Sequence, residues 1–246
     1  MDRVVTTAEA NTLKAYDAIA PLYAEYSAKY QSYLNAVDRL VIERLRPGMR
    51  LLDVGSGDGR RLKKIAATHG LTAVVSVEPS GEMAALCGAT TGFPVHQLFG
   101  DALDSLPDSG FDAITALWNV FGHMESSEVR LRALRHMRAK LTAGGCIMLD
   151  VNNRHNQLAY GRVKVLGRRV IDTLAFDEKR GDAHYEWKIG AKSYPASGHL
   201  FTPGEMARLF SQAEMKVAER YTVNYNSGEV SILPFNGQLF FRLEPT

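Results

Sequence analysis

Several features are scarce in this sequence. Cysteine occurs only twice among 246 residues, as Cys87 and Cys146, and both stand in apolar surroundings. Two such cysteines indicate neither a disulfide framework nor a zinc site, so we expect buried side chains and a reducing compartment, the cytoplasm. No apolar run reaches roughly 18 residues, the length of a membrane span. Residues 1–7 lack the apolar core of a signal peptide.

The chain also lacks an excess of charge of either sign. Lysine and arginine number 29 against 27 acidic residues, which gives a net charge of +2. A charge this small indicates neither nucleic acid nor a membrane as a partner. The seven histidines are scattered, so we expect no bound metal. Hydrophobic residues at 46% and charged residues at 23% are ordinary for a globular domain, which excludes a disordered chain, a collagen and a simple coiled coil.

Two stretches near the N-terminus have helical periodicity. Apolar residues recur every three or four positions across 13–23, and Pro21 predicts a break there. A second apolar stripe covers 33–45 and ends at the proline and glycine of 47–48. We expect both helices to form a lid.

The pattern then changes to short apolar runs that alternate with helices. The predicted strands are 51–54, 73–77, 95–99, 113–117 and 146–149. Gly70 is expected to end the first intervening helix, and Ser80 to cap the second. A third, over 127–141, is expected to stop at the glycine pair 144–145. Such alternation predicts an α/β fold with a doubly wound, mostly parallel sheet covered on both faces.

The last third has a different character. Residues 156–200 alternate weakly, which predicts short antiparallel strands inserted over one end of the sheet. Thr202 and Glu205 form a capping box, and the stretches 215–223 and 237–243 then close a seven-stranded sheet. We therefore expect one domain, made of a helical lid (1–47), a ligand-binding core (48–155), a substrate-side cap (156–200) and a C-terminal helix with closing strands (201–246).

The strongest chemical signal is a glycine-rich turn between the first strand and its helix. Asp53 is followed by glycines at 55, 57 and 59. These glycines allow a sharp turn and a close approach of ligand to backbone, beside a helix N-terminus that favours anions. The spacing is neither the dinucleotide fingerprint nor a phosphate loop with its Gly-Lys-Ser/Thr end. A purely structural turn is the alternative reading.

Acidic residues follow the next two strands. Glu78 ends the second strand, where a carboxylate can accept hydrogen bonds from both hydroxyls of a ribose. Asp101 follows the third strand, where it can accept a hydrogen bond from an adenine amino group. The alternatives are a solvated surface acid for Glu78 and a helix N-cap for Asp101.

Five segments in order, 51–59, 74–79, 100–102, 111–117 and 141–151, resemble the motifs of class I S-adenosylmethionine-dependent methyltransferases. The resemblance covers about residues 10–151. It implies a Rossmann-like fold and S-adenosylmethionine as cofactor. The cofactor-binding residues it implies are Tyr16, Tyr23, Asp53, Gly55, Ser56, Gly57, Gly59, Glu78, Pro79, Asp101, Ala102, Leu117 and Asn119.

A closer resemblance concerns the methyl acceptor. Leu22-Tyr23 together with Gly122-His123 resembles small-molecule methyltransferases, including sugar N-methyltransferases of antibiotic pathways. This likeness implies that Tyr23 closes over the cofactor and that His123 lies near the acceptor, which makes these two the catalytic candidates. His123 is either a general base or a residue that shapes the pocket, since alignment alone can drive methyl transfer.

Further polar and aromatic residues follow the later strands. Those expected to bind substrate are Trp118, His123, Asn152, Arg154 and Tyr225, although turn or capping roles remain open for the last three. We expect a small-molecule methyl acceptor, with a nitrogen or oxygen nucleophile, and neither nucleic acid nor membrane as a partner. The protein is expected to be a monomer or a homodimer.

Three other functions share some of these sequence features. An RNA or protein methyltransferase would use the basic run over 130–140, although charge runs are usually solvated helix faces. A cofactor-binding protein without turnover would keep the same glycines and acids. A dehydrogenase is disfavoured by the glycine spacing.

Overall fold

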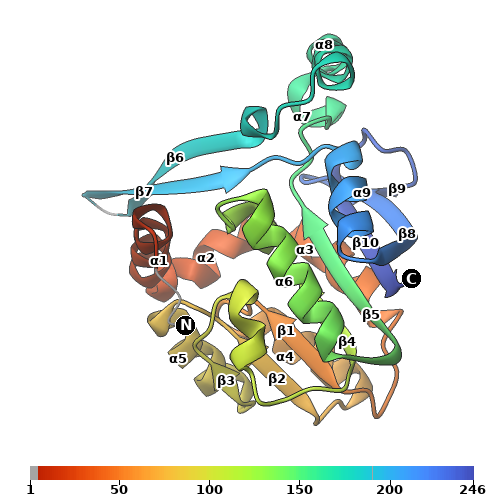
Figure 1. Cartoon of the computed structure of the whole chain (residues 1–246). Helices are drawn as coiled ribbons and strands as arrows, with labels where there is room; N and C mark the ends of the chain where they lie inside the picture. The colour runs from red at the N-terminus through yellow and green to blue at the C-terminus, as the bar shows by residue number, and fades with distance from the viewer. Residues whose placement is uncertain (1–4, 190) are drawn as a thin grey trace.

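The computed structural model describes residues 5–189 and 191–246, and a single large sheet dominates it (Figure 1). Its strands in spatial order are β3 (Val95–His96), β2 (Val74–Val77), β1 (Leu51–Val54), β4 (Phe111–Ala116), β5 (Leu141–Val151), β10 (Gln238–Pro245), β8 (Met215–Val223) and β9 (Val230–Ser231). The first five are parallel, and β10 runs antiparallel between β5 and β8. The predicted seven strands are confirmed, and the two-residue β9 adds an eighth at the edge.

The strand order reverses between β1 and β4. From this point β2 and β3 extend the sheet in one direction, whereas β4 and β5 extend it in the other. Register aligns Asp53 of β1 with Ser76 of β2 and Thr115 of β4, so the carboxyl ends of the three strands lie together. Ligands of doubly wound sheets bind outside the carboxyl ends of the strands at such a reversal.

Helices cover both faces of the sheet, because successive side chains of a strand point to opposite faces and both faces are apolar. Leu52 and Ile114 pack against α6 (Ser127–Lys140) and α9 (Pro203–Gln212) on one face. Leu51 and Ala113 pack against α3 (Gln31–Ile42) and α4 (Arg60–His69) on the other. The doubly wound α/β class predicted from the alternating runs is confirmed.

Local signals set most helix boundaries. Gly70, with φ +61°, ends α4 in the left-handed conformation. The Ser80 hydroxyl accepts a hydrogen bond from the Met83 amide at 3.2 Å and caps α5 (Gly81–Thr91). Thr202 and Glu205 form the predicted capping box of α9. These boundaries follow from residues that satisfy the free amides and carbonyls of helix ends.

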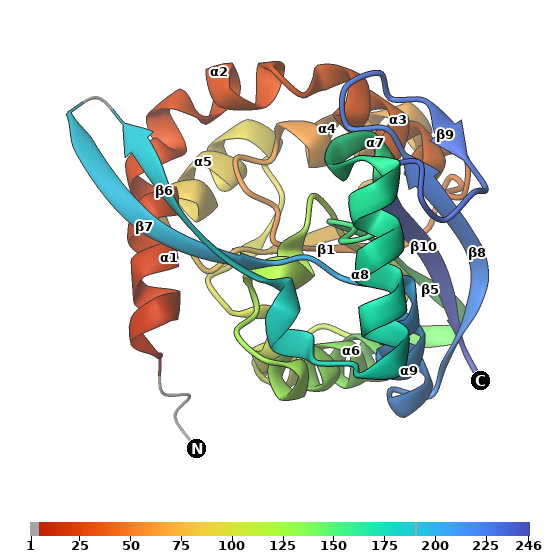
Figure 2. The ribbon, with the colours of Figure 1, turned by 90° about the horizontal axis from the view of Figure 1, so that it is seen from above.

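The N-terminal helical segment, the predicted lid, is interrupted at the position that Pro21 predicts. The helix α1 (Thr7–Ile19) gives way to a short 3-10 helix, η1 (Ala20–Leu22), that contains Pro21, and α2 (Tyr23–Ala28) follows. Figure 2 shows α1 alongside the long hairpin β6–β7. Through α1, the lid therefore contacts this hairpin.

The prediction for the segment 156–200 is correct for its second part only. Its second part is an antiparallel hairpin, β6 (Asp182–Ile189) with β7 (Lys192–His199). Its first part is helical, with α7 (Gln157–Tyr160), α8 (Arg162–Leu174) and the 3-10 helix η4 (Glu178–Gly181), so short strands were the wrong prediction there. Val163, Leu166, Val170 and Leu174 do recur at helical spacing, so the sequence carried a helix signal that the prediction missed. This stripe is exposed in the structure, and Val165 is the one buried apolar residue of α8.

Two smaller boundaries also differ from the prediction. The strand β3 ends at His96, not at 99, because the Leu98 amide turns back to the His96 carbonyl, and the 3-10 helix η2 (Gly100–Ser105) follows. Gly144 and Gly145 lie inside β5 and do not end α6. They sit beside a register irregularity between β4 and β5, where a Cβ on Gly145 would lie 2.9 Å from the Phe111 carbonyl oxygen.

This close approach predicts a stability difference between two glycine substitutions. Gly145→Ala is expected to lower the free energy of unfolding by about 1–3 kcal/mol, because the new methyl overpacks against backbone. Gly167→Ala in α8 is the control, since its Cβ meets nothing within 4 Å, and it is expected to raise stability by about 0.5–1 kcal/mol. Urea unfolding measures both, and an unchanged midpoint for Gly145→Ala contradicts the packing described.

Candidate functional site

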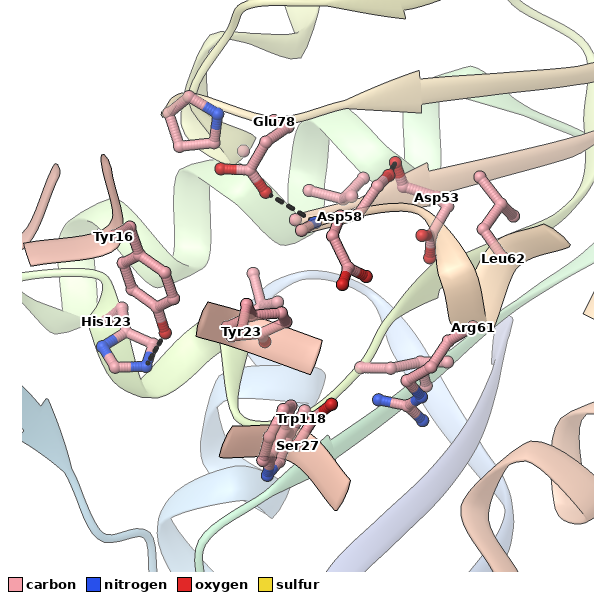
Figure 3. Close-up of a pocket in the computed structure, with 18 of the residues that line it drawn as sticks. Tyr16, Tyr23, Ser27, Asp53, Asp58, Arg61, Leu62, Glu78, Trp118 and His123 are labelled. Carbon is pink, nitrogen blue, oxygen red and sulfur yellow. Dashed lines mark hydrogen bonds between the residues drawn. The ribbon is translucent and has the colours of Figure 1, made fainter. Parts of the chain in front are cut away.

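A cavity of about 430 Å³ lies at the carboxyl ends of β1, β2 and β4. The glycine-rich turn and Glu78 form one side of it, and residues of the lid form the other (Figure 3). The predicted cofactor residues that line it are Tyr16, Tyr23, Asp53, Gly55, Ser56, Gly57, Glu78, Pro79, Asp101 and Leu117. Most of the predicted set therefore converges on one cavity.

Glu78 is tied to the glycine turn. Its carboxylate accepts hydrogen bonds from the Gly57 amide at 2.8 Å and from the Ser80 amide at 3.0 Å. Burial raises the pKa of Glu78 to about 7, against the pull of these two donors. A carboxylate placed here still has acceptor capacity toward a ligand, because each oxygen carries two lone pairs.

Asp53 and Asp101 are both buried. The Thr115 hydroxyl donates to the Asp53 carboxylate at 2.5 Å, and burial raises the pKa of Asp53. Asp101 pairs with Arg132 of α6 at 2.6 Å. Phe99 precedes η2, and Asp101 lies in its first turn, directly before the kink at Ala102.

A strained turn follows β4 at the inner end of the cavity. Trp118 and Asn119 have φ values of +65° and +62°, which non-glycine residues rarely adopt. The carboxylate of Asp150, at the end of β5, accepts the Trp118 amide at 2.7 Å and the Tyr33 hydroxyl at 2.5 Å. Asn119 in turn accepts the Asn152 amide at 2.9 Å. Burial raises the pKa of both Asp150 and Tyr33. Buried hydrogen bonds therefore hold this turn in place.

A second cavity, of about 380 Å³, adjoins the first. It lies under the hairpin β6–β7. Four residues line both cavities, namely Tyr16, Tyr23, Trp118 and His123. The other residues that line the second cavity are Tyr26, Asn119, Asn152, Tyr160, Ala183, Tyr185, Trp187, Gly198, His199, Leu200 and Tyr225. The two cavities thus meet at a junction of aromatic side chains.

Tyr16 and His123 are hydrogen-bonded at this junction. The Tyr16 hydroxyl lies 3.0 Å from His123 Nε2 (Figure 3). His123 Nδ1 lies 3.1 Å from the Ser197 carbonyl oxygen. Burial lowers the pKa of His123 and raises that of Tyr16, so both are neutral near pH 7. Because a carbonyl only accepts, Nδ1 carries the proton and Nε2 accepts from the tyrosine.

Some predicted residues lie away from the first cavity. Asn119 lines the second, as do the predicted substrate residues Asn152 and Tyr225. Gly59, Ala102 and Arg154 line neither. Gly59 is the N-cap of α4 and packs closely against Cys87, where a Cβ would lie 2.9 Å from the sulfur. Arg154 pairs with Asp172 of α8 at 3.1 Å.

Other site residues were missed from the sequence. Arg61 lines the first cavity and pairs with buried Asp38 of α3 at 2.9 Å, and no sequence signal joins these two. Tyr26, Tyr185 and Trp187 line the second cavity. The alternation of Tyr185 and Trp187 along one strand face was the available signal for the last two.

A family model described as a methyltransferase domain matches residues 23–219. The chain belongs to this family of methyltransferase domains. This match confirms the resemblance to methyltransferases that the sequence motifs indicated.

Two curated proteins are similar to this methyltransferase. The probable tRNA methyltransferase 9B of Homo sapiens is 26% identical over 198 residues, which cover 76% of this chain and 39% of the human protein. Its counterpart in Bos taurus is 29% identical over 147 residues, which cover 57% of this chain and 30% of that protein. The chain therefore spans well under half the length of these curated relatives.

Solved structures share the fold along nearly the whole methyltransferase chain. The CcbJ methyltransferase of Streptomyces caelestis has a TM-score of 0.69 at 15% identity and covers 96% of this chain and 99% of its own. The sugar N-methyltransferase KedS8 of Streptoalloteichus sp has a TM-score of 0.59 at 20% identity and covers 92% of each chain. DhpI, solved with SAH, has a TM-score of 0.63 at 18% identity and covers 98% of each.

Neither a metal-binding cluster nor a membrane-spanning helix occurs in the described ranges of the methyltransferase. Within 5–189 and 191–246, the histidine, cysteine and acidic side chains form no group of three that could hold a metal ion. None of the helices in the same ranges combines the length and the hydropathy that a bilayer crossing requires.

The raised pKa of Glu78 predicts a pH dependence of stability in the ligand-free methyltransferase. The folded state keeps the Glu78 proton up to about pH 7, whereas the unfolded chain loses it near the ordinary value of 4.5. The folded state therefore binds more protons in this window, and the Glu78 contribution to stability falls as pH rises through it, by roughly 2–3 kcal/mol.

Glu78→Gln is expected to remove this fall, measured by urea unfolding at about pH 5 and about pH 8. Glu82→Gln, at an exposed position of the neighbouring helix α5, is expected to keep the wild-type change. A Glu78→Gln variant whose stability changes with pH as the wild type does would show that Glu78 titrates normally.

Proposed function

We propose that this methyltransferase transfers the methyl group of S-adenosylmethionine to a nitrogen or oxygen of a small molecule, a specialised metabolite, by in-line displacement. The observation that carries the proposal is the junction of two cavities at Tyr16, Tyr23, Trp118 and His123. One cavity suits the cofactor, the other suits the acceptor, and the methyl group would cross between them.

In this proposal the first cavity holds the cofactor. Glu78 binds the ribose hydroxyls, Asp101 the adenine amino group, and the glycine turn the methionine portion. Tyr23 would close the cavity, since its ring lies 3.5 Å from the position of a Cβ on Gly57. Burial raises the pKa of the Tyr23 phenol, so Tyr23 remains protonated and acts through its ring and hydroxyl.

The chemical step needs few groups from the protein. A lone pair of the acceptor attacks the methyl carbon, the carbon–sulfur bond breaks, and its electron pair returns to sulfur. Holding the two reactants in line can supply about 7–11 kcal/mol of the barrier. His123 is neutral, yet its Nε2 lone pair is engaged by Tyr16. We infer that the Tyr16–His123 pair positions the acceptor, and that proton removal through His123 requires Tyr16 to rotate away.

A tRNA acceptor is the second candidate, because the curated relatives are described as probable tRNA methyltransferases. The basic run over 130–140 was the sequence feature that favoured it. Each of its cations instead contacts another part of this chain: Arg130 donates to the Phe121 and Met124 carbonyls, Arg132 pairs with Asp101, Arg135 donates to the Gln212 carbonyl, Arg138 pairs with Glu214, and Lys140 donates to the Leu106 carbonyl. These contacts give the basic run a role within this fold, so the run is not by itself evidence for an RNA-binding surface.

Methyl transfer from isotopically labelled cofactor tests this choice. A panel of small organic amines and alcohols is offered in parallel with transfer RNA, and label is expected in the small-molecule fraction. Trp118→Ala is expected to reduce the transfer at least about tenfold through lost alignment at the junction. Arg135→Ala, on the exposed face of α6, is expected to leave it unchanged. Label found in RNA alone, and lost with Arg135→Ala, would make the tRNA candidate correct.

A further inference from the structure

The second cavity is walled by aromatic rings. Six tyrosines and two tryptophans line it. They come from distant parts of the chain: Tyr16, Tyr23 and Tyr26 from the lid, Trp118 from the strained turn after β4, Tyr160 from α7, Tyr185 and Trp187 from the hairpin, and Tyr225 from the segment after β8. We call these eight side chains the aromatic box.

The rings of the aromatic box stand at different angles and so present both faces and edges. Tyr16 and Trp187 lie edge to face, with centroids 5.0 Å apart and an interplanar angle of 71°. Tyr26 stacks on Trp118 at 5.9 Å and tilts by 45° against Trp187 at 5.6 Å. Ring faces carry a negative electrostatic potential that attracts cations. A group inside the box therefore meets aromatic side chains that come from several elements of the fold.

The cavity carries little formal charge. No lysine, arginine, aspartate or glutamate lines it in the described part of the chain. Burial raises the pKa of Tyr185 and of Tyr225 to about 12 and lowers that of His123, so these three are neutral near pH 7. His199 also lines the cavity, and its two ring nitrogens face the carboxylates of Asp182 at 2.7 Å and Glu205 at 2.8 Å.

Two arginines, Arg154 and Arg168, do not line the cavity, although Arg168 lies on the ring of Tyr160, a member of the box. Arg154 pairs with Asp172 and donates to the Arg180 carbonyl. Arg168 lies 4.4 Å from the ring centroid of Tyr160 and donates to the Arg154 carbonyl. A phosphate or carboxylate inside the box would lose its hydration without gaining a lysine or arginine among the described lining residues, which is unfavourable. An organic cation would also lose its hydration, but it would gain contacts with the faces of the aromatic rings.

We propose that the aromatic box binds the methyl acceptor as an amine that becomes an ammonium ion, and that it excludes acceptors bearing phosphate or carboxylate at this end. This inference rests on the proposed small-molecule methyl transfer and narrows the nucleophile to nitrogen. The amine lone pair forms the new nitrogen–carbon bond, the carbon–sulfur pair returns to sulfur, and the positive charge moves from sulfur to nitrogen. A tertiary amine keeps that charge, whereas a primary or secondary amine then releases a proton to water.

The position of the box fits this movement of charge. Tyr16, Tyr23 and Trp118 belong to both cavities, so the same rings face the sulfonium before transfer and the ammonium after it. An oxygen acceptor lacks this match, because its neutral product carries no charge for the rings to stabilise. The box therefore favours transfer to nitrogen through the charge of the product.

Binding of three probes to the full-length protein, saturated with S-adenosylhomocysteine, tests the aromatic box. The probes are choline, its neutral isostere with a tert-butyl group in place of trimethylammonium, and phosphocholine. Calorimetry is expected to show choline binding at least about tenfold more tightly than the isostere. Phosphocholine is expected to bind more weakly than choline, because its phosphate finds no cation.

Two variants on one strand distinguish the box from general disruption of the hairpin. Trp187→Leu is expected to abolish the preference of choline over the isostere, while Lys188→Leu, whose side chain is exposed, is expected to retain it. Equal affinities for choline and the isostere, no measurable choline binding, or tighter binding of phosphocholine would each overturn the aromatic box. The binding of S-adenosylhomocysteine, measured first, and the labelled-transfer assay would still judge the proposed function separately.

Discussion

The buried carboxylate of Asp150 is the contact on which the two-cavity arrangement depends. It accepts hydrogen bonds from the Trp118 amide and the Tyr33 hydroxyl, and so ties the end of β5 to the turn after β4 and to α3. Without these bonds the positive φ angles of Trp118 and Asn119 would cost about 1–3 kcal/mol each with no compensation. The turn places the Trp118 ring where the cavities meet. The Trp118 ring therefore borders both the cavity proposed for the cofactor and the cavity proposed for the acceptor.

Charge is distributed unequally between the cavities. The first contains the buried acids Glu78, Asp53 and Asp101, and burial raises the pKa of the first two. S-adenosylmethionine carries a positive sulfonium, and a positive ligand stabilises nearby carboxylates in their charged form. The second cavity offers aromatic rings and no lining lysine, arginine or acid among the described residues. Methyl transfer to an amine would carry one positive charge from the acidic cavity to the aromatic one.

Sequence patterns predicted the parts of the structure that local chemistry determines. The strands of the core, the glycine turn, the helix caps and the break at Pro21 follow from apolar runs and from residues with special backbone preferences. The helix α8 was missed although Val163, Leu166, Val170 and Leu174 have helical spacing, because the weak alternation across 156–200 dominated the prediction. Only part of the aromatic box could be predicted from the sequence, because tertiary packing brings Tyr26, Tyr185 and Trp187 together. Likewise, Arg154 looked like a pocket residue, yet it pairs with Asp172, which no spacing rule indicates.

A crystal structure of the protein with S-adenosylhomocysteine and choline would show whether the two cavities hold the two reactants side by side. We expect the ribose hydroxyls within hydrogen-bond distance of Glu78, the sulfur beside Tyr23 and Trp118, and the trimethylammonium group among the rings of Tyr26, Tyr185 and Trp187. This expectation is contradicted if the sulfur lies away from the junction of the two cavities, or if the ammonium group binds outside the aromatic box.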